Sequence, residues 1–127
     1  MNLIHKDITD KILNAFYTVY SELGYGFLEK IYENALLYEL SEAGLKCERQ
    51  KPIKVYYKDQ QVGEYFADIV VENKVILEIK AAESIAKEHE YQLINYLKAT
   101  KIEIGLVLNF GKNLNSGEKS TLDSFYP

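Results

Sequence analysis

Two short segments, residues 74–81 and 104–111, are nearly continuous runs of apolar residues, and they restrict the fold more than any other feature of the sequence. Side chains alternate between the two faces of a sheet, so a strand that is apolar at almost every position is covered on both faces. The chain has 127 residues, about the length of one domain with a single core. We therefore expect one domain with a central sheet flanked by helices.

Apolar residues recur at helical spacing in three further parts of the chain. Residues 4–23 form the first of these segments, and the Gly-Tyr-Gly at 24–26 separates it from a second at about 27–43. Gly44 follows the second segment where a C-cap glycine is expected. The third segment, residues 84–100, lies between the two apolar strands. These segments predict three α-helices.

Two more strands precede the apolar ones. Residues 51–58 and 62–71 are rich in Val, Ile, Tyr and Phe, and residues 59–61 between them suit a hairpin turn. The expected element order is ααβββαβ, which is a mixed α/β (α+β) class with a mixed sheet. Residues 113–127 show no sustained period, so we expect a loosely attached tail on a single domain that spans 1–127.

Composition narrows the functional classes. The chain has 15 Lys and Arg against 19 Asp and Glu, a formal net charge of -4, which argues against a general nucleic-acid coat. An acidic cluster that binds a divalent metal would still reverse the charge locally. The single cysteine cannot form an internal disulfide, and no leader or long apolar run indicates secretion or a membrane span. We expect a cytoplasmic protein with no membrane partner.

Three charged residues, Asp68, Glu78 and Lys80, lie in or beside the apolar strands. Glu78 and Lys80 share one face of their strand because they are two residues apart. A three-residue loop at 72–74 would place Asp68 directly opposite Glu78, with Cβ atoms about 5 Å apart. A two-residue turn at 73–74 would instead oppose Asp68 to Ile79, unless a bulge restores the first pairing. The register is left open by the sequence.

Two carboxylates held this close repel each other unless one is protonated or both bind a cation. Hard oxygen ligands suit Mg²⁺, which prefers one or two carboxylates together with water and phosphate oxygens. Lys80 beside such a metal would hold a phosphate oxygen or orient the attacking water. The alternative is a half-solvated strand on which Glu78 and Lys80 neutralise each other and Asp68 merely ends its strand.

Two helices offer further polar candidates. His89, Gln92 and Tyr96 fall on one face of the third helix, where Gln92 either reaches the Glu78 and Lys80 end or is solvated. A surface role is the simpler interpretation of His89, and a core role is an equal alternative for Tyr96. Glu29 and Glu33 lie one turn apart on the second helix, where the helix dipole also favours exposed glutamates. We expect Glu33 to be exposed and leave both alternatives open for Glu29.

Residues 26–32 resemble a named signature. Gly26-Phe27-Leu28-Glu29-Lys30-Ile31-Tyr32 has the pattern of the bacterial GxxExxY proteins, and the likeness continues through FADIVVENKVILEIKA, QLINYL and IGLVLNFG. It covers roughly residues 5–112 in the family's order. That family is similar to a compact branch of the PD-(D/E)XK nuclease superfamily. The resemblance implies a restriction-endonuclease-like core, with a mixed sheet flanked by helices.

The resemblance also implies roles for individual residues. Asp68, Glu78 and the Ile79 carbonyl would hold Mg²⁺ (or Mn²⁺), with Glu29 as the helix glutamate of the metal site. Lys80 would complete the E-x-K pair, and Gln92 with Tyr96 matches the Q-x-x-x-Y of exonuclease-like members, in which Gln92 orients Lys80 or a DNA phosphate. There are two departures: Ala67 replaces the proline of the superfamily's name, and the tail lacks an arginine-containing ending that would contact DNA.

These features lead to one expected function and two competing ones. The first is a Mg²⁺-dependent DNA nuclease that hydrolyses phosphodiester bonds with a metal-activated water. The second is a non-catalytic nucleic-acid-binding, regulatory or assembly module, in which surplus aromatic residues form a homodimer face. A small-molecule enzyme ranks last because the chain has no Gly-rich phosphate loop or nucleophile elbow. Five basic residues near the first hairpin either line a path for DNA phosphates or are solvated: Lys46, Arg49, Lys51, Lys54 and Lys58.

Overall fold

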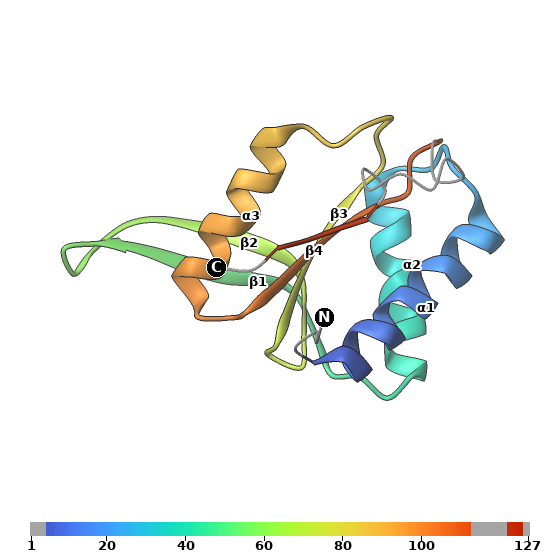
Figure 1. Ribbon diagram of the computed structural model, residues 1–127, viewed down its shortest axis with the longest axis horizontal. Helices are drawn as coiled ribbons and strands as arrows, with labels where there is room; N and C mark the ends of the chain where they lie inside the picture. Colours follow the sequence, from blue (N-terminus) through green and yellow to red (C-terminus); the bar gives the residue numbers. More distant parts are fainter. Residues whose placement is uncertain (1–4, 113–121, 126–127) are drawn as a thin grey trace.

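The computed structural model describes residues 5–112 and 122–125, and it centres on one five-stranded mixed sheet with strand order β1-β2-β3-β4-β5 (Figure 1). The elements, in chain order, are α1 (Lys6–Leu23), α2 (Glu29–Glu42), β1 (Cys47–Tyr57), β2 (Gln60–Val71), β3 (Val75–Lys80), α3 (Lys87–Thr100), β4 (Ile104–Asn109) and β5 (Leu122–Phe125). Strands β3 and β4 are parallel, and the other neighbouring pairs are antiparallel. A parallel pair needs a crossover connection, which α3 provides.

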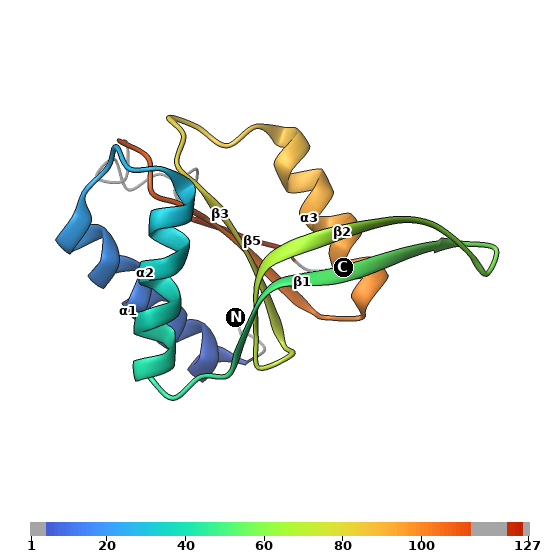
Figure 2. The same ribbon diagram turned by 180° about the vertical axis from the view of Figure 1, so that it is seen from behind.

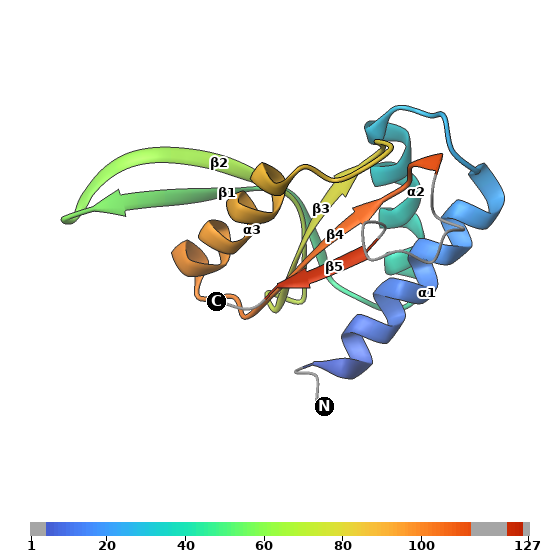
Figure 3. The same ribbon diagram turned by 45° about the horizontal axis from the view of Figure 1, so that its top comes forward.

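The mixed α/β class with flanking helices is confirmed. The order ααβββαβ is correct as far as β4, but the chain continues into β5, which pairs antiparallel with β4 (Figure 3). This pairing covers an edge of β4 that would otherwise expose its backbone groups. The expectation of a loosely attached tail is therefore wrong for Leu122–Phe125. Residues 113–121 and 126–127, the rest of that tail, lie outside the described residues.

Helices cover the sheet from both sides, as the apolar strands predict. Helices α1 and α2 lie together on one side and α3 lies on the other (Figure 1). Leu77 and Ile79 of β3 pack toward α1 and α2, whereas Ile76 packs toward α3. The central strand β3 is therefore buried on both faces, which explains why its sequence is apolar apart from Glu78 and Lys80.

Strands β1 and β2 change faces part-way along their length. Cys47 and Ile69 pack with the α1 and α2 cluster, whereas Ile53 and Ala67 pack with the α3 cluster. Simple alternation would put Cys47 and Ile53 of β1 on one face, and likewise Ala67 and Ile69 of β2. The break falls at Gln50, whose φ of 49° is left-handed and which is absent from the β1–β2 ladder. Beyond it the two strands leave the sheet as a long two-stranded arm (Figure 2).

The two hairpin turns test the loop predictions. The β1–β2 turn consists of Lys58 and Asp59, not residues 59–61, and both have positive φ (49° and 65°), as two-residue hairpin turns require. The β2–β3 loop has three residues, since Val71 pairs with Val75. The three-residue loop at 72–74 is thus the alternative that the structure adopts.

Tyr32 closes the connection between α1 and α2. Its ring is fully buried and stacks on Phe110, with centroids 4.4 Å apart. Its hydroxyl donates to the Gly24 carbonyl and accepts from the Phe27 N–H at 3.2 Å. Gly24 and Gly26 have φ of 68° and 110°, so the loop needs glycine to bring its backbone to this hydroxyl.

We expect Tyr32→Phe to lower the free energy of unfolding by about 1–2 kcal/mol, because it leaves a partly buried N–H and a carbonyl without their partner. Urea unfolding measures the change. Tyr38→Phe is the matched control, since Tyr38 lies exposed on the same helix. Equal stability of the two variants would contradict the role of the Tyr32 hydroxyl.

Candidate active site

Asp68 and Glu78 face each other where β2 and β3 separate. The ladder between these strands runs from Val71 and Val75 to Ile69 and Leu77, and Asp68 and Glu78 are the next pair. Side chains replace the backbone bonds there: the Asp68 N–H donates to Glu78 Oε2 at 3.2 Å, and the Ile79 N–H donates to Asp68 Oδ2 at 2.7 Å. The site is therefore built into the end of a sheet ladder, which holds both carboxyl groups in place.

The carboxyl groups of Asp68 and Glu78 have little positive charge near them. Burial, followed by repulsion from Asp68, raises the pKa of Glu78 to about 8. Burial also raises the pKa of Asp68, partly offset by the hydrogen bond from the Ile79 N–H. The nearby Glu33 charge raises the pKa of Asp68 further, whereas the Lys80 charge and the Gln50 side chain lower it. The pair is thus prepared to receive a cation.

Lys80 lies two residues beyond Glu78 on β3, half-buried, and its charge lowers the pKa of both carboxyl groups. Asn109 of β4 fixes this end of the strand. It pairs with Lys80 in the parallel ladder and is only 4% exposed, and its amide bonds both the N–H and the C=O of Ala82 at 3.0 and 2.9 Å. The sequence had not marked Asn109 as a site residue, because an asparagine at a strand end commonly has a local turn role.

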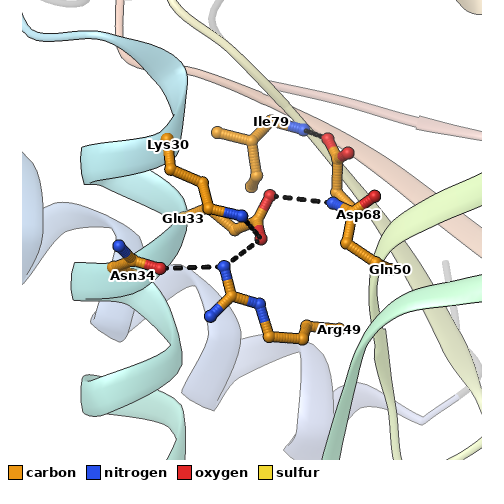
Figure 4. A network of polar contacts seen from close by, with 7 residues as sticks. All are labelled: Lys30, Glu33, Asn34, Arg49, Gln50, Asp68 and Ile79. Atoms are coloured by element: carbon orange, nitrogen blue, oxygen red, sulfur yellow. Dashed lines mark hydrogen bonds and ion pairs between the residues drawn. The ribbon is translucent and has the colours of Figure 1, made fainter.

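Helix α2 supplies a glutamate to the site, but it is Glu33 and not Glu29. Glu33 is 5% exposed, its Oε2 lies 2.9 Å from Arg49 Nη2, and its Oε1 accepts from Gln50 Nε2 at 3.2 Å (Figure 4). Its charge raises the pKa of both Asp68 and Glu78. Glu29 is exposed at the first residue of α2, before the buried stripe of the helix begins. The expectation that Glu33 is exposed is therefore wrong.

Helix α3 brings Tyr96 to the carboxylates rather than Gln92. The Tyr96 ring stacks on Tyr65 of β2, and burial followed by the charges of Glu78 and Asp68 raises the pKa of Tyr96. The Tyr65 hydroxyl is buried and has no hydrogen-bond partner among the described residues. Gln92 is exposed. His89 is half-buried rather than on the open surface, and its Nδ1 also lacks a partner within the described part of the chain.

Tyr65 is a site neighbour that the sequence did not reveal. Burial, followed by the Glu78 charge, raises the pKa of its hydroxyl strongly. An aromatic residue in an alternating strand is normally read as core, so no signal separated it from the other tyrosines. The face change at Asp68 is what directs Tyr65 toward α3.

The basic residues of the first hairpin have different surroundings. Arg49 bonds Glu33 and Asn34, and Lys51 bonds Glu48 and Asn73. A groove of about 370 Å³ between β1 and α3 has Lys51 and Lys54 on its wall, and an adjoining one of about 490 Å³ is lined by Lys54 and Lys98. Neither groove has an acidic residue in its lining.

Within residues 5–112 and 122–125, no cluster of three or more His, Cys, Asp or Glu side chains is arranged to bind a metal. Asp68 and Glu78 are a pair, and the third carboxylate nearby, Glu33, is engaged by Arg49 and Gln50. No helix in the described part of the chain has both the length and the apolar character needed to cross a bilayer.

A family model described as the PD-(D/E)XK nuclease superfamily matches residues 6–121, which is most of the chain. The chain belongs to this superfamily. Ala67, the residue before Asp68, is fully buried. In this PD-(D/E)XK protein the buried position before the aspartate packs toward α3, and alanine fills it.

A solved structure supports the same fold. The chain is similar to the crystal structure of SSO0001, with a TM-score of 0.54 and 16% sequence identity. The match covers 93% of this chain and 63% of the solved one, so the chain spans less than two thirds of that protein's length. No curated protein matches the chain significantly.

Proposed function

We propose that this PD-(D/E)XK protein is a Mg²⁺-dependent nuclease of the GxxExxY type that hydrolyses phosphodiester bonds in DNA. The observation that carries the proposal is the meeting of Asp68 and Glu78 at the end of the β2–β3 ladder, with Lys80 on the same strand. Burial raises the pKa of both carboxyl groups, and the Asp68 charge raises the pKa of Glu78 further. Such a pair destabilises a protein that binds nothing there, which favours a functional reason for keeping it.

The donor set fits a hard divalent cation. Each carboxyl group gives one oxygen to a backbone N–H, Oε2 of Glu78 to Asp68 and Oδ2 of Asp68 to Ile79, which leaves the second oxygen of each for another partner. Mg²⁺ binds to proteins through one or two carboxylates and completes its shell with water and substrate phosphate. Asp68, Glu78 and the Ile79 carbonyl would hold it, and Mn²⁺ would fit the same oxygens.

When bound, the cation supplies Lewis acidity, polarising the phosphodiester and making a water molecule a stronger nucleophile. The chain's own contribution is charge and position. The Lys80 ammonium group stabilises negative charge that develops on the phosphate and orients the attacking water beside Glu78. Gln92 and Glu29 are exposed, so the role open to each of them is a contact with the substrate.

DNA as the partner is supported by the lysine-lined grooves between β1 and α3. Lys51, Lys54 and Lys98 line them without an acidic residue, on a chain whose overall charge is negative. Local positive charge of this kind attracts the phosphate backbone.

A cytoplasmic setting agrees with the single cysteine of the chain. Cys47 is half-buried, and burial raises the pKa of its thiol to about 11.

A second candidate function is a non-catalytic binding or assembly module, including a homodimer. The observation that favours it is the exposure of large apolar side chains on and beside the β1–β2 arm. These residues are Tyr56, Tyr57, Val62, Phe66 and Tyr91. Exposed aromatic residues are common in protein interfaces and also stack on single-stranded bases.

The test incubates purified protein with linear, nicked and branched DNA, and with RNA, in Mg²⁺, in Mn²⁺ and in a chelator. We expect cleavage of DNA only when the metal is present. Calorimetric titration of Mg²⁺ into the protein is the parallel measurement. A protein that neither binds the metal nor cleaves any of these substrates would favour the binding module.

A further inference from the structure

We propose that Gln50 is a positioning residue that holds the Asp68 carboxyl group in its working orientation; this inference rests on the nuclease function proposed above. Gln50 lies on β1 at the break in the β1–β2 ladder, between the pairs Arg49 with Ile69 and Lys51 with Ala67. Its place is therefore directly across from Asp68. The sequence had offered no reason to select it.

The backbone of Gln50 is in an unfavourable conformation. Its φ of 49° is left-handed, a region that glycine adopts freely and that glutamine rarely adopts. Strain of this kind persists where the surrounding contacts enforce it, and such sites are frequently functional. A glycine at this position would allow the same face change of the strand without strain. The contacts of the side chain must therefore explain why position 50 is glutamine rather than glycine.

The side chain connects α2 to the active-site aspartate. Its Nε2 donates to Glu33 Oε1 at 3.2 Å, and the same side chain lies beside the Asp68 carboxyl group, whose pKa it lowers. Figure 4 shows Gln50 between the Glu33 carboxylate and Asp68. An amide NH₂ has two donors, so one can serve each carboxyl group.

Glu33 is a rigid anchor for this amide. Its Oε2 lies 2.9 Å from Arg49 Nη2 and 3.8 Å from Lys30 Nζ, while Oε1 accepts from Gln50 (Figure 4). Arg49 is itself held by Asn34 at 2.9 Å. Both oxygens of the buried carboxylate are engaged, which makes Glu33 a support for Gln50 and leaves the pair Asp68 and Glu78 as the carboxylates that face a cation.

Asp68 is consequently restrained from two elements. Strand β3 holds Oδ2 through the Ile79 N–H at 2.7 Å, and α2 reaches the same carboxyl group through Glu33 and Gln50. Without Gln50, the carboxyl group would keep only the β3 contact and would rotate more freely. A group that must meet a reacting phosphate within fractions of an ångström loses rate when its orientation is not fixed.

The deciding variant is Gln50→Gly, which removes the amide and relieves the backbone. Asp59→Gly is the matched control, because Asp59 has φ of 65° in the distant turn of the arm. We expect both variants to melt at or above the wild-type temperature. Only Gln50→Gly should lose kcat, by about tenfold with KM changed by less than about twofold, as loss of a positioning hydrogen bond to a charged group predicts.

A second measurement does not depend on nuclease activity. Amide hydrogen exchange by NMR should show the Ile79 N–H exchanging about tenfold faster in Gln50→Gly, with the Leu77 N–H of the same strand unchanged. Glu33→Gln, which removes the anchoring charge, should act in the same direction, and the double variant should lose no more than either alone. Additive losses would overturn the proposed connection.

Unchanged Ile79 exchange in Gln50→Gly, or unchanged kcat in an active enzyme, would overturn the positioning role. If the wild-type protein cleaves no nucleic acid, the proposed function fails, and the Ile79 measurement still decides whether Gln50 restrains Asp68. A melting temperature that falls in Gln50→Gly but not in Asp59→Gly would also count against the proposal, because it would mark the residue as a structural support of the strand.

Discussion

Lys80→Ala and Asp68→Ala should each reduce metal-dependent DNA cleavage by about 10²–10³-fold, the usual effect of removing one charged group from a preorganised site. Lys80 provides the ammonium group closest to the carboxylates along β3, and its charge lowers the pKa of both Asp68 and Glu78. Its loss removes charge stabilisation at the phosphate. Asp68→Ala removes one of the two carboxylates proposed to hold the cation.

Lys98→Ala is the matched control for Lys80→Ala. Lys98 is an exposed lysine on α3 that lines the groove beside β1, so its loss should weaken DNA binding and leave the rate at saturating DNA nearly unchanged. Initial rates with a labelled duplex at saturating Mg²⁺ measure the effect. Traces of equal activity in the wild type, Lys80→Ala and Asp68→Ala would point to a contaminating nuclease and would remove the support for this site.

The pairing of Asp68 with Glu78 could be predicted from the sequence, because strand alternation and loop length are local rules. Once the loop at 72–74 has three residues, Asp68 and Glu78 must meet, and the structure adopts that register. The apolar character of residues 74–81 similarly predicts a strand covered on both faces, as β3 is. Local periodicity was enough for these features.

The parts that could not be predicted depend on contacts between distant elements. Glu33 faces the site because α2 packs beside β1, where Arg49 and Gln50 meet it. Tyr65 and Gln50 take their directions from the ladder break, which is a tertiary feature without a glycine to mark it. Sequence spacing on the helix could not separate Glu29 from Glu33, since both lie on the same side one turn apart.

The end of the β2–β3 ladder is where the fold creates the proposed active site. A regular β2–β3 pair would continue its backbone hydrogen bonds past Ile69 and Leu77 and leave the Asp68 and Glu78 side chains free of those bonds on one face of the sheet. Here the side chains take those bonds instead, so two half-buried acidic groups remain next to each other. The active site should therefore be a source of instability when it holds no cation.

Glu78→Gln should stabilise the cation-free protein at pH 7–8, raising the free energy of unfolding by about 2–4 kcal/mol. Burial raises the pKa of Glu78 to about 8 in the folded protein, from an ordinary value of 4.5. The folded state therefore favours the protonated carboxyl group, whose stabilising effect is complete below about pH 4.5 and is lost as the pH rises toward 8. Glutamine has the shape of the protonated group and keeps an oxygen for the Asp68 N–H at every pH.

Urea unfolding in a chelator at about pH 4.5 and pH 7.5 separates the two proteins. The wild type should be the less stable one at the higher pH, with the difference nearly absent at the lower. Glu64→Gln is the control, since Glu64 is an exposed glutamate on the arm.

Added Mg²⁺ should raise the stability of the wild type at pH 7.5 far more than that of Glu78→Gln, because binding to the folded state stabilises it in proportion to affinity. A Glu78→Gln protein that is less stable than the wild type in the chelator would contradict the burial of repelling carboxylates, and an equal gain from Mg²⁺ in both would exclude Glu78 as a ligand.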